Sequence, residues 1–238
     1  MRLHSERTGH GPRLVLVHGF TQTGRSWRSL VPTLGSSHEV VLVDAPGHGG
    51  SVEVVADLPT GAELLVETGG SATYIGYSMG ARFCLHAALA RPEAVRALVL
   101  ISGTAGLDTA AERAARRAAD ADVADRLDHL GVDAFLEAWL AQPLFGGLSP
   151  AAAEIDDRRR NTAAGLRSSL ELAGTGTQAS LWGRLPELTM PVLVLAGADD
   201  AKFVALAHRL ATGIGDNAEL AVMDGAGHTV HLEQPHAF

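Results

Sequence analysis

Short runs of apolar residues recur along the chain, and each is followed by turn residues and then by a helical stretch. The runs are rich in β-branched residues and leucine and are almost continuously apolar, which is typical of parallel strands covered on both faces. We expect strands at Leu14–Val17, Val40–Val43, Thr73–Gly76, Ala97–Ile101, Val192–Ala196 and Leu220–Met223. We expect helices at Ser26–Leu34, Ala62–Thr68, Met79–Ala90 and Ala201–Ile214. This alternation predicts a doubly wound α/β fold, to which a short N-terminal hairpin adds antiparallel edge strands.

The alternation breaks between Gly103 and Pro191, where we expect no strand. This stretch predicts five helices instead, at Thr109–Asp120, Val123–Leu127, Val132–Gln142, Pro150–Thr162 and Leu166–Ala173. A helical insertion of this size between two core strands is typical of a cap over the carboxyl edge of the sheet, where open α/β sheets bind their ligands. We therefore expect a core formed by residues 1–103 and 184–238, and a helical cap formed by residues 104–183.

The last five residues, 234–238, have the pattern of a helix start, with Pro235 in the first turn. The chain stops at that point. We expect a final helix to begin here, and we leave open whether the rest of it is missing.

The composition agrees with one globular domain that carries an inserted cap, since the chain has 238 residues of which 46% are hydrophobic. The net charge of −8 argues against a nucleic-acid partner, because phosphate binding requires a basic surface. Cys84 is the single cysteine, so no intramolecular disulfide forms. The chain has no signal-peptide pattern and no run near the roughly 18 apolar residues of a membrane span. We expect a cytoplasmic protein without a membrane span, and we leave its oligomeric state open.

Residues 76–80, Gly-Tyr-Ser-Met-Gly, match the pattern G-x-S-x-G. They follow an expected strand and open an expected helix, which is the context in which this pattern marks a nucleophile elbow. In such an elbow the serine lies in a sharp, strained turn with its Oγ exposed, and the small residues at 76 and 80 make room where strand and helix crowd together. We therefore predict that Ser78 is a catalytic nucleophile or base, although the pentapeptide alone also occurs by chance.

The partners of such a serine follow in the order acid and then histidine. The acidic loop after the expected strand at 192–196 contains Asp199 and Asp200. We predict that Asp200 is the acid, which holds the imidazole tautomer and offsets its charge. Asp199 is the rival candidate, and its alternative role is a helix N-cap.

Eleven histidines compete for the role of the base. We predict that it is His228, because it lies in the loop after the last expected strand and follows small residues that allow a tight approach. His231 comes three residues later, and we expect it to be structural or to lie at the surface.

The oxyanion that such a site generates needs two backbone N–H donors. We predict that Met79, at the helix start, and Phe20, in the loop after the first long strand, supply them. His18 could ligate a metal, but no second ligand follows at a useful spacing, so we expect it to pack and to hydrogen-bond within its loop. The glycine-rich loop at 43–51 lacks the phosphate-binding patterns, so nucleotide binding is unsupported. We predict neither a metal nor a cofactor.

Together these segments resemble the α/β-hydrolase superfamily over essentially the whole chain. Finer features resemble one of its families, the 2-succinyl-6-hydroxy-2,4-cyclohexadiene-1-carboxylate synthases of menaquinone biosynthesis. The matching segments are 76–82 with an arginine one helical turn after the serine, 197–203 with Lys-Phe after the acid, 226–233 around the histidine, and 112–116, 139–145 and 158–161 in the expected cap.

The resemblance implies a lyase that eliminates pyruvate from 2-succinyl-5-enolpyruvyl-6-hydroxy-3-cyclohexene-1-carboxylate, a substrate with three carboxylates. Arginine suits such a ligand because it binds carboxylates bidentately at constant charge. The resemblance implies that substrate-binding residues are Arg82, Arg116, Arg158, Tyr77 and Trp139. The alternative for Tyr77 is simple packing. For the cap arginines it is a solvated helix face, or replacement by the neighbouring Arg113, Arg117, Arg159 and Arg160.

The mechanism implied by the resemblance is proton abstraction by an activated Ser78, with no metal or organic cofactor. Two other functions stay open. One is a serine hydrolase, either a carboxylesterase or a C–C bond hydrolase, in which the same three residues act and the arginines are incidental. The other is a non-catalytic binding or receptor protein of the same fold, against which the intact Ser, Asp and His set argues.

Overall fold

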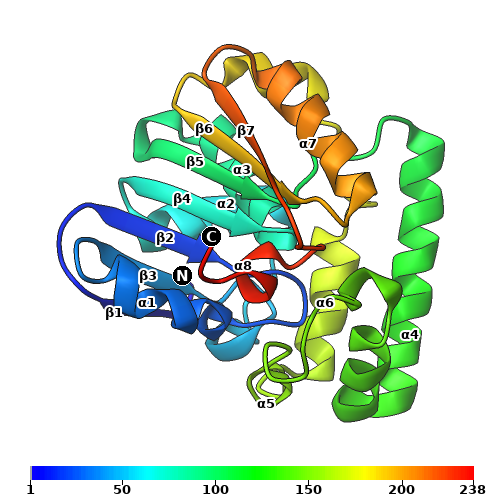
Figure 1. Cartoon of the computed structure of the whole chain (residues 1–238). Helices are drawn as coiled ribbons and strands as arrows, with labels where there is room; N and C mark the ends of the chain where they lie inside the picture. Colours follow the sequence, from blue (N-terminus) through cyan, green and yellow to red (C-terminus); the bar gives the residue numbers. More distant parts are fainter. Residues whose placement is uncertain (1) are drawn as a thin grey trace.

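A seven-stranded sheet forms the centre of the computed structural model, which describes residues 2–238 (Figure 1). Its strands are β1 (Ser5–Thr8), β2 (Arg13–Val17), β3 (Glu39–Val43), β4 (Ala72–Tyr77), β5 (Val95–Ile101), β6 (Val192–Gly197) and β7 (Ala218–Met223). They are ordered β1-β3-β2-β4-β5-β6-β7, and every neighbouring pair except β1 and β3 is parallel. The mostly parallel, doubly wound sheet expected from the sequence is confirmed.

The expected N-terminal hairpin is wrong. β1 pairs antiparallel with β3, with Ser5 opposite Val43, and it does not pair with β2. Both edges of β2 are already occupied, because Leu14 lies opposite Val40 on one side and opposite Thr73 on the other. The chain therefore crosses to the free edge of β3 and adds one antiparallel edge strand.

The two faces of the sheet bury alternate residues of each strand, as the pleat requires. Val15 and Val17 of β2 pack in the cluster that also contains side chains of α2 (Leu58–Gly69), α3 (Met79–Ala90) and α7 (Ala201–Ile214). Leu14 and Leu16 face the other way. Their cluster contains residues of the 3₁₀ helix η1 (Gly24–Leu30) and of the short helix α8 (Val230–Glu233), with α1 (Val31–Leu34) packed against it. Both faces are thus covered, which explains the continuous apolar runs.

Several expected helices have different bounds. The stretch expected as one helix at 26–34 forms η1 followed by α1. Two further 3₁₀ turns, η2 (Gly49–Ser51) and η3 (Pro92–Ala94), lie in loops of the core. No helix of residues 2–238 has the length and hydrophobicity that crossing a bilayer requires.

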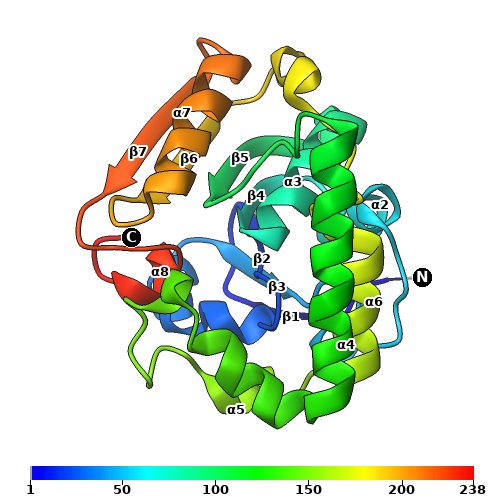
Figure 2. The same ribbon diagram turned by 90° about the vertical axis from the view of Figure 1, so that its right-hand side faces the viewer.

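Between β5 and β6 the chain forms helices only, as expected. They are α4 (Ala110–Leu140), η4 (Pro143–Phe145), α5 (Ile155–Arg158), α6 (Ala163–Ala173) and η5 (Trp182–Glu187). Figures 1 and 2 show α4 and α6 side by side beyond the carboxyl ends of the strands. This is the position predicted for the cap. The division into a core of residues 1–103 and 184–238 and a cap of residues 104–183 stays a prediction.

Within this region the helix boundaries differ from those expected. The helices expected at 109–120 and 123–127 are one helix, and the break comes at Gly131, whose φ of 73° and ψ of 168° only glycine adopts readily. The long helix expected at 150–162 is wrong, since only α5 forms there. Glu154 has left-handed backbone angles that interrupt it, and the side chain of Thr162 caps the N-terminus of α6 instead.

The helix expected to begin at Gln234 is also absent from the described residues. The short helix α8 ends at Glu233, and Gln234 has φ of −131° and ψ of 57°, which are not helical. Residues 234–238 make one hydrogen-bonded turn, in which the Phe238 N–H donates to the carbonyl oxygen of Gln234 at 3.0 Å.

A buried histidine makes the covered face beneath η1 sensitive to acid. His231 is fully buried and stacks on Trp27 with ring centroids 4.0 Å apart, and neither of its ring nitrogens has a hydrogen-bond partner within residues 2–238. Burial lowers the pKa of His231 to about 3. The unfolded chain therefore binds the extra proton as pH falls below about 6.5, while the folded chain does not.

We predict that His231→Phe makes the protein less sensitive to acid. Between about pH 6.5 and about pH 5, the free energy of unfolding of the wild type falls by up to about 2 kcal/mol more than that of the variant. Urea unfolding at a series of pH values measures this difference. The exposed His10→Phe is the control, and equal pH dependence of wild type and His231→Phe would contradict the prediction.

Candidate active site

Ser78 lies in a tight turn between β4 and α3. Its φ of 51° and ψ of −106° are strained for a residue with a side chain, and its N–H donates to the carbonyl oxygen of Ile101 at 2.8 Å. A Cβ at Gly76 would lie 2.4 Å from the carbonyl oxygen of Gly80, and one at Gly80 would lie 2.1 Å from that of Val17. Only glycine therefore fits at both flanking positions.

The imidazole of His228 lies between Ser78 and Asp200. Its Nε2 is 3.2 Å from Ser78 Oγ, and its Nδ1 is 2.8 Å from Asp200 Oδ2. Because a carboxylate only accepts hydrogen bonds, Nδ1 carries the proton and Nε2 is left to accept one from the serine hydroxyl. His228 and Asp200 are buried, so solvent competes little for these bonds. The arrangement suits the removal of a proton from Ser78.

Asp200, and not Asp199, reaches the histidine. Burial disfavours ionisation of the Asp200 carboxyl, but the hydrogen bond from His228, helped by that from the Phe203 N–H and by the Lys202 charge, outweighs it and lowers the pKa of Asp200 below its ordinary value. The N-cap role considered for Asp199 is wrong as well. The Asp200 side chain caps α7 by accepting from the Phe203 N–H at 3.2 Å, while Asp199 is exposed.

Two residues that sequence reasoning missed hold the His228 loop. The carboxylate of Glu233 accepts from the N–H of Gly227 at 2.7 Å and from the N–H of Thr229 at 2.8 Å, on either side of His228. Ser102 Oγ donates to the carbonyl oxygen of His228 at 2.9 Å. Glu233 lies in the segment 226–233 that resembles the family around the histidine, and Ser102 directly follows β5. The sequence therefore already placed both polar residues near the carboxyl edge of the sheet.

The other two histidines weighed from the sequence have structural contacts. His231 packs on Trp27, as described above. His18 is buried; its Nδ1 donates to the carbonyl oxygen of Gly19 at 2.8 Å and its Nε2 accepts from the Ala45 N–H at 3.0 Å. Within residues 2–238, no group of three His, Cys, Asp or Glu side chains is arranged to hold a metal ion.

The two residues predicted to supply oxyanion N–H groups, Met79 and Phe20, both line the pocket of Ser78. Met79 is the first residue of α3, so its N–H has no acceptor within the helix. Phe20 lines the same pocket as Met79 and Ser78. The role of the Phe20 and Met79 N–H groups as oxyanion donors stays a prediction.

The loop of Phe20 is held in place because Asn161 Nδ2 donates to the carbonyl oxygen of Thr21 at 2.7 Å, and Gln22 Oε1 accepts from the Gly19 N–H at 2.9 Å.

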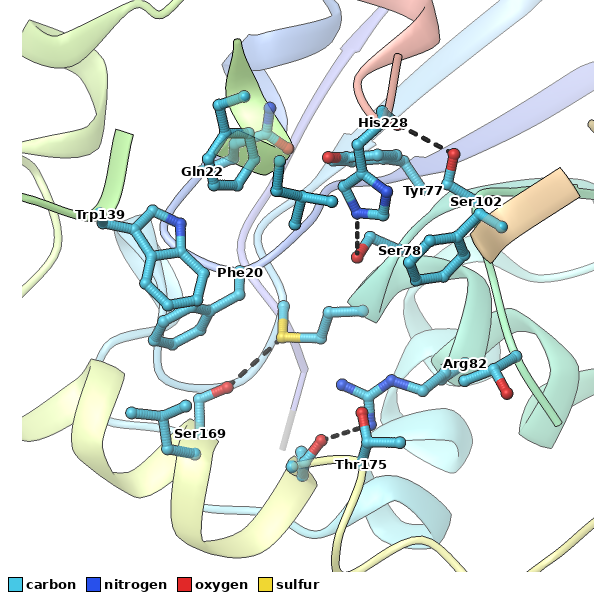
Figure 3. Close-up of a pocket in the computed structure, with 18 of the residues that line it drawn as sticks. Phe20, Gln22, Tyr77, Ser78, Arg82, Ser102, Trp139, Ser169, Thr175 and His228 are labelled. Carbon is cyan, nitrogen blue, oxygen red and sulfur yellow. Dashed lines mark hydrogen bonds between the residues drawn. The ribbon is translucent and has the colours of Figure 1, made fainter. Parts of the chain in front are cut away.

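The pocket above Ser78 is lined by four cationic side chains. Figure 3 shows Ser78 and His228 facing Phe20 and Trp139 across this pocket, with Arg82 at its lower end. Of the lining residues in the described part of the chain, none is Asp or Glu. A protein with a net charge of −8 thus has a local excess of positive charge at this site. The cationic residues are Arg82, Arg116, Arg158 and Lys202.

Arg82 and Arg158 are both buried, and neither forms an ion pair with a carboxylate of residues 2–238. Arg82 donates from Nη1 to the carbonyl oxygen of Ala173 at 2.6 Å. Arg158 donates from Nε to the carbonyl oxygen of Ala153 at 2.7 Å and from Nη1 to Thr21 Oγ1. Burial lowers the pKa of each guanidinium to about 10, so both stay charged at neutral pH. Such buried, unpaired cations are costly, and an anionic ligand offsets the cost.

Of the other cap arginines considered from the sequence, Arg116 lines the pocket and its alternatives do not. Arg116 is exposed, lines the pocket, and donates from Nε to Asp120 Oδ1 at 2.7 Å. The neighbours that were alternatives do not line the pocket and have other partners. Those partners are the Leu107 carbonyl for Arg113, the Gly176 carbonyl for Arg117, Asp133 and Asp156 for Arg159, and Asp157 for Arg160.

Aromatic side chains form the rest of the wall. Tyr77 lines the pocket and also packs in the core. Its hydroxyl is 3.2 Å from Thr229 Oγ1, and burial raises the pKa of that hydroxyl. Trp139 packs edge to face on Phe20 with centroids 5.2 Å apart. Phe145 and Phe203 line the pocket too, and neither these two nor Lys202 were predicted to do so.

Residues 14–238 match the model of the alpha/beta hydrolase family. The chain is 32% identical over 236 residues to the 2-succinyl-6-hydroxy-2,4-cyclohexadiene-1-carboxylate synthase of Serratia proteamaculans, with 95% of this chain and 90% of the relative covered. It is 34% identical over 236 residues to the protein of the same name from Photorhabdus laumondii, with 95% of this chain and 82% of that relative covered.

Among solved structures, MenH from S. aureus is similar with a TM-score of 0.89 and 28% identity, and the match covers 99% of this chain and 94% of that one. A thermophilic esterase from Thermogutta terrifontis is similar with a TM-score of 0.78, 24% identity, and coverage of 99% and 89%. At that identity the likeness to the esterase shows the fold alone.

We predict that Gly80→Ala strongly destabilises the protein, because the added Cβ meets the Val17 carbonyl at a distance that no side-chain rotation relieves. The free energy of unfolding should fall by about 3 kcal/mol. Gly183→Ala is the matched control, since nothing lies within 4 Å of a Cβ at that position; its change should stay within about 0.5 kcal/mol. Thermal and urea unfolding measure both, and a stable Gly80→Ala protein would show that the elbow tolerates a side chain.

Proposed function

The chain belongs to the α/β-hydrolase family and, within it, to the family of 2-succinyl-6-hydroxy-2,4-cyclohexadiene-1-carboxylate synthases, and we propose that it catalyses the reaction named by that family. The substrate is 2-succinyl-5-enolpyruvyl-6-hydroxy-3-cyclohexene-1-carboxylate, and the products are the cyclohexadiene and pyruvate. The protein thereby acts as a lyase in menaquinone biosynthesis. A cytoplasmic location, expected from the sequence, is part of the proposal.

One observation carries the proposal: the pocket that contains Ser78 and His228 is lined by four cations and, within residues 2–238, by no carboxylate. A substrate with three carboxylates compensates this charge. A neutral ester would leave the buried guanidinium groups of Arg82 and Arg158 without a counterion, which is energetically unfavourable.

The first step that we propose is removal of the proton at ring carbon 2, next to the succinyl carbonyl. Ser78 Oγ takes this proton while its own hydroxyl proton passes to His228 Nε2, and Asp200 offsets the charge that develops on the imidazole. Negative charge moves onto the succinyl oxygen. The N–H groups of Phe20 and Met79 are the proposed donors to that oxygen.

The second step releases pyruvate. The electrons of the enolate form the bond between carbons 2 and 3, the double bond between carbons 3 and 4 moves to carbons 4 and 5, and the bond from carbon 5 to the ether oxygen breaks. The leaving group departs as the enolate of pyruvate, which becomes pyruvate by taking a proton at its methylene carbon. His228 gives up the proton that it took from Ser78, and the site returns to its starting state. No acyl-enzyme forms, and no cofactor is consumed.

A serine hydrolase is the second candidate, because the Ser78, His228 and Asp200 arrangement also suits acyl transfer. The arginines distinguish the two: an esterase does not need them, whereas the lyase depends on them. A binding protein without catalysis is disfavoured by a serine that is hydrogen-bonded to a buried, correctly oriented histidine.

The deciding experiment incubates the purified protein with the enolpyruvyl substrate and follows pyruvate with lactate dehydrogenase. We expect rapid pyruvate release by the wild type and loss of nearly all of it in Ser78→Ala. Absence of pyruvate, together with good turnover of p-nitrophenyl esters, would overturn the lyase assignment in favour of the hydrolase. Failure of a fluorophosphonate to label Ser78, with no turnover of either substrate, would favour the binding protein.

A pair of neighbouring arginines tests the role of the cationic pocket. We predict that Arg158→Gln lowers kcat/KM by about 100-fold, because it removes a buried charge that faces the substrate. Arg159→Gln is the matched control on the same helix end; Arg159 is exposed and paired with Asp133 and Asp156, so its kcat/KM should stay unchanged. Equal effects of the two substitutions would remove Arg158 from the substrate site.

A further inference from the structure

Lys202 is unusual in this chain in two respects. It is the single lysine beside eighteen arginines. It is also the second residue of α7, at the helix end where the backbone dipole disfavours a cation. It forms no ion pair with a carboxylate of residues 2–238 that would compensate this position. The Asp200 carboxylate that caps this helix end interacts favourably with the Lys202 charge without forming an ion pair with it. The ammonium therefore remains available to an anion that is not part of the chain.

The position of Lys202 connects it to the reacting groups. Lys202 lines the pocket of Ser78. Its Nζ is 5.4 Å from the ring centroid of Phe203, and that ring lies 4.4 Å from the ring of His228. The ammonium charge also contributes to the lowered pKa of Asp200. Lys202 is therefore the cation on the α7 side of the pocket, close to the base.

Lys202 differs from the buried arginines in its exposure to solvent. Arg82 and Arg158 are held by backbone and hydroxyl acceptors in the interior, whereas the Lys202 side chain is exposed. An exposed ammonium is strongly hydrated and binds a carboxylate less tightly than a buried guanidinium does. Such a group suits the fragment that must leave, while buried arginines suit the carboxylates that stay on the ring product.

We infer that Lys202 binds the carboxylate of the departing enolpyruvyl group, and this inference rests on the proposed lyase function. Arg82, Arg116 and Arg158 then serve the two carboxylates of the ring product. As the bond between carbon 5 and oxygen breaks, its electrons pass to the enolate oxygen next to that carboxylate. The ammonium stabilises this charge until the enolate takes a proton at carbon and pyruvate diffuses away.

The test compares Lys202→Gln and Lys202→Arg with the wild type. We expect Lys202→Gln to lower kcat/KM by about tenfold, because it removes one charge-assisted contact. The inhibition constant of added pyruvate should rise by a similar factor, whereas that of the ring product stays the same. Lys202→Arg should retain most of the activity. Arg126→Gln, which removes an exposed cation of α4 outside the pocket, is the charge-matched control.

A second measurement separates contact with the leaving group from an effect on the base. If Lys202 acted only by its field on Asp200 and His228, Lys202→Gln would also change the rate at which a fluorophosphonate labels Ser78 and the pH dependence of that rate. We expect neither to change near neutral pH, where Asp200 stays ionised although loss of the ammonium removes one of the influences that lower its pKa.

The outcomes distinguish this inference from the proposed function. Pyruvate release by the wild type, with unchanged kcat/KM and unchanged pyruvate inhibition in Lys202→Gln, overturns the role of Lys202 and leaves the lyase function intact. A change in labelling equal to the change in kcat/KM overturns it as well. No pyruvate from the wild type overturns both.

Discussion

The close approach of α3 to β2 and β4 is the constraint on which this site depends. Gly76 and Gly80 allow the helix to begin so near the strands that Ser78 is forced into positive φ, and this conformation points the serine away from the sheet and toward the cap. The same crowding places the first N–H of the helix beside the serine. The histidine and the acid come from loops after β7 and β6, so the order of the parallel strands brings them to the same edge.

Around this edge the protein concentrates positive charge that its overall composition lacks. Backbone carbonyls and a threonine hydroxyl, and not carboxylates, hold the buried guanidinium groups of Arg82 and Arg158. Neutral acceptors orient a cation without cancelling its charge, so the full charge remains available to a ligand. An internal ion pair would have made the folded protein easier to stabilise, but it would have removed the attraction for an anion.

The sequence was most informative where a short pattern determines local geometry. The strand runs, the elbow at 76–80 and the loops of Asp200 and His228 follow from hydrophobic pattern and glycine placement, so their positions were predictable. The helical bounds of the cap were not, because they depend on single backbone choices such as the left-handed Glu154 and the kink at Gly131. The family resemblance named Arg82, Arg116 and Arg158, which all line the pocket, but the hydrophobic pattern alone could not have separated them from their neighbours. Arg158 and Arg159 are adjacent in sequence, and only the rotation of α5 turns one inward.

The contacts between α5 and the loop of Phe20 limit how the inserted helices can be exchanged. Arg158 donates to Thr21, Asn161 donates to the Thr21 carbonyl and Asp157 accepts from Thr23, so one segment of the inserted helices holds the loop that carries a proposed oxyanion donor. Helical insertions are often treated as modules that recombine freely on a common scaffold. Here residues 155–161 and 18–24 form one hydrogen-bonded structural unit. A chimera that exchanges the insertion without this loop would separate the arginine proposed to bind the substrate from the proposed oxyanion donor.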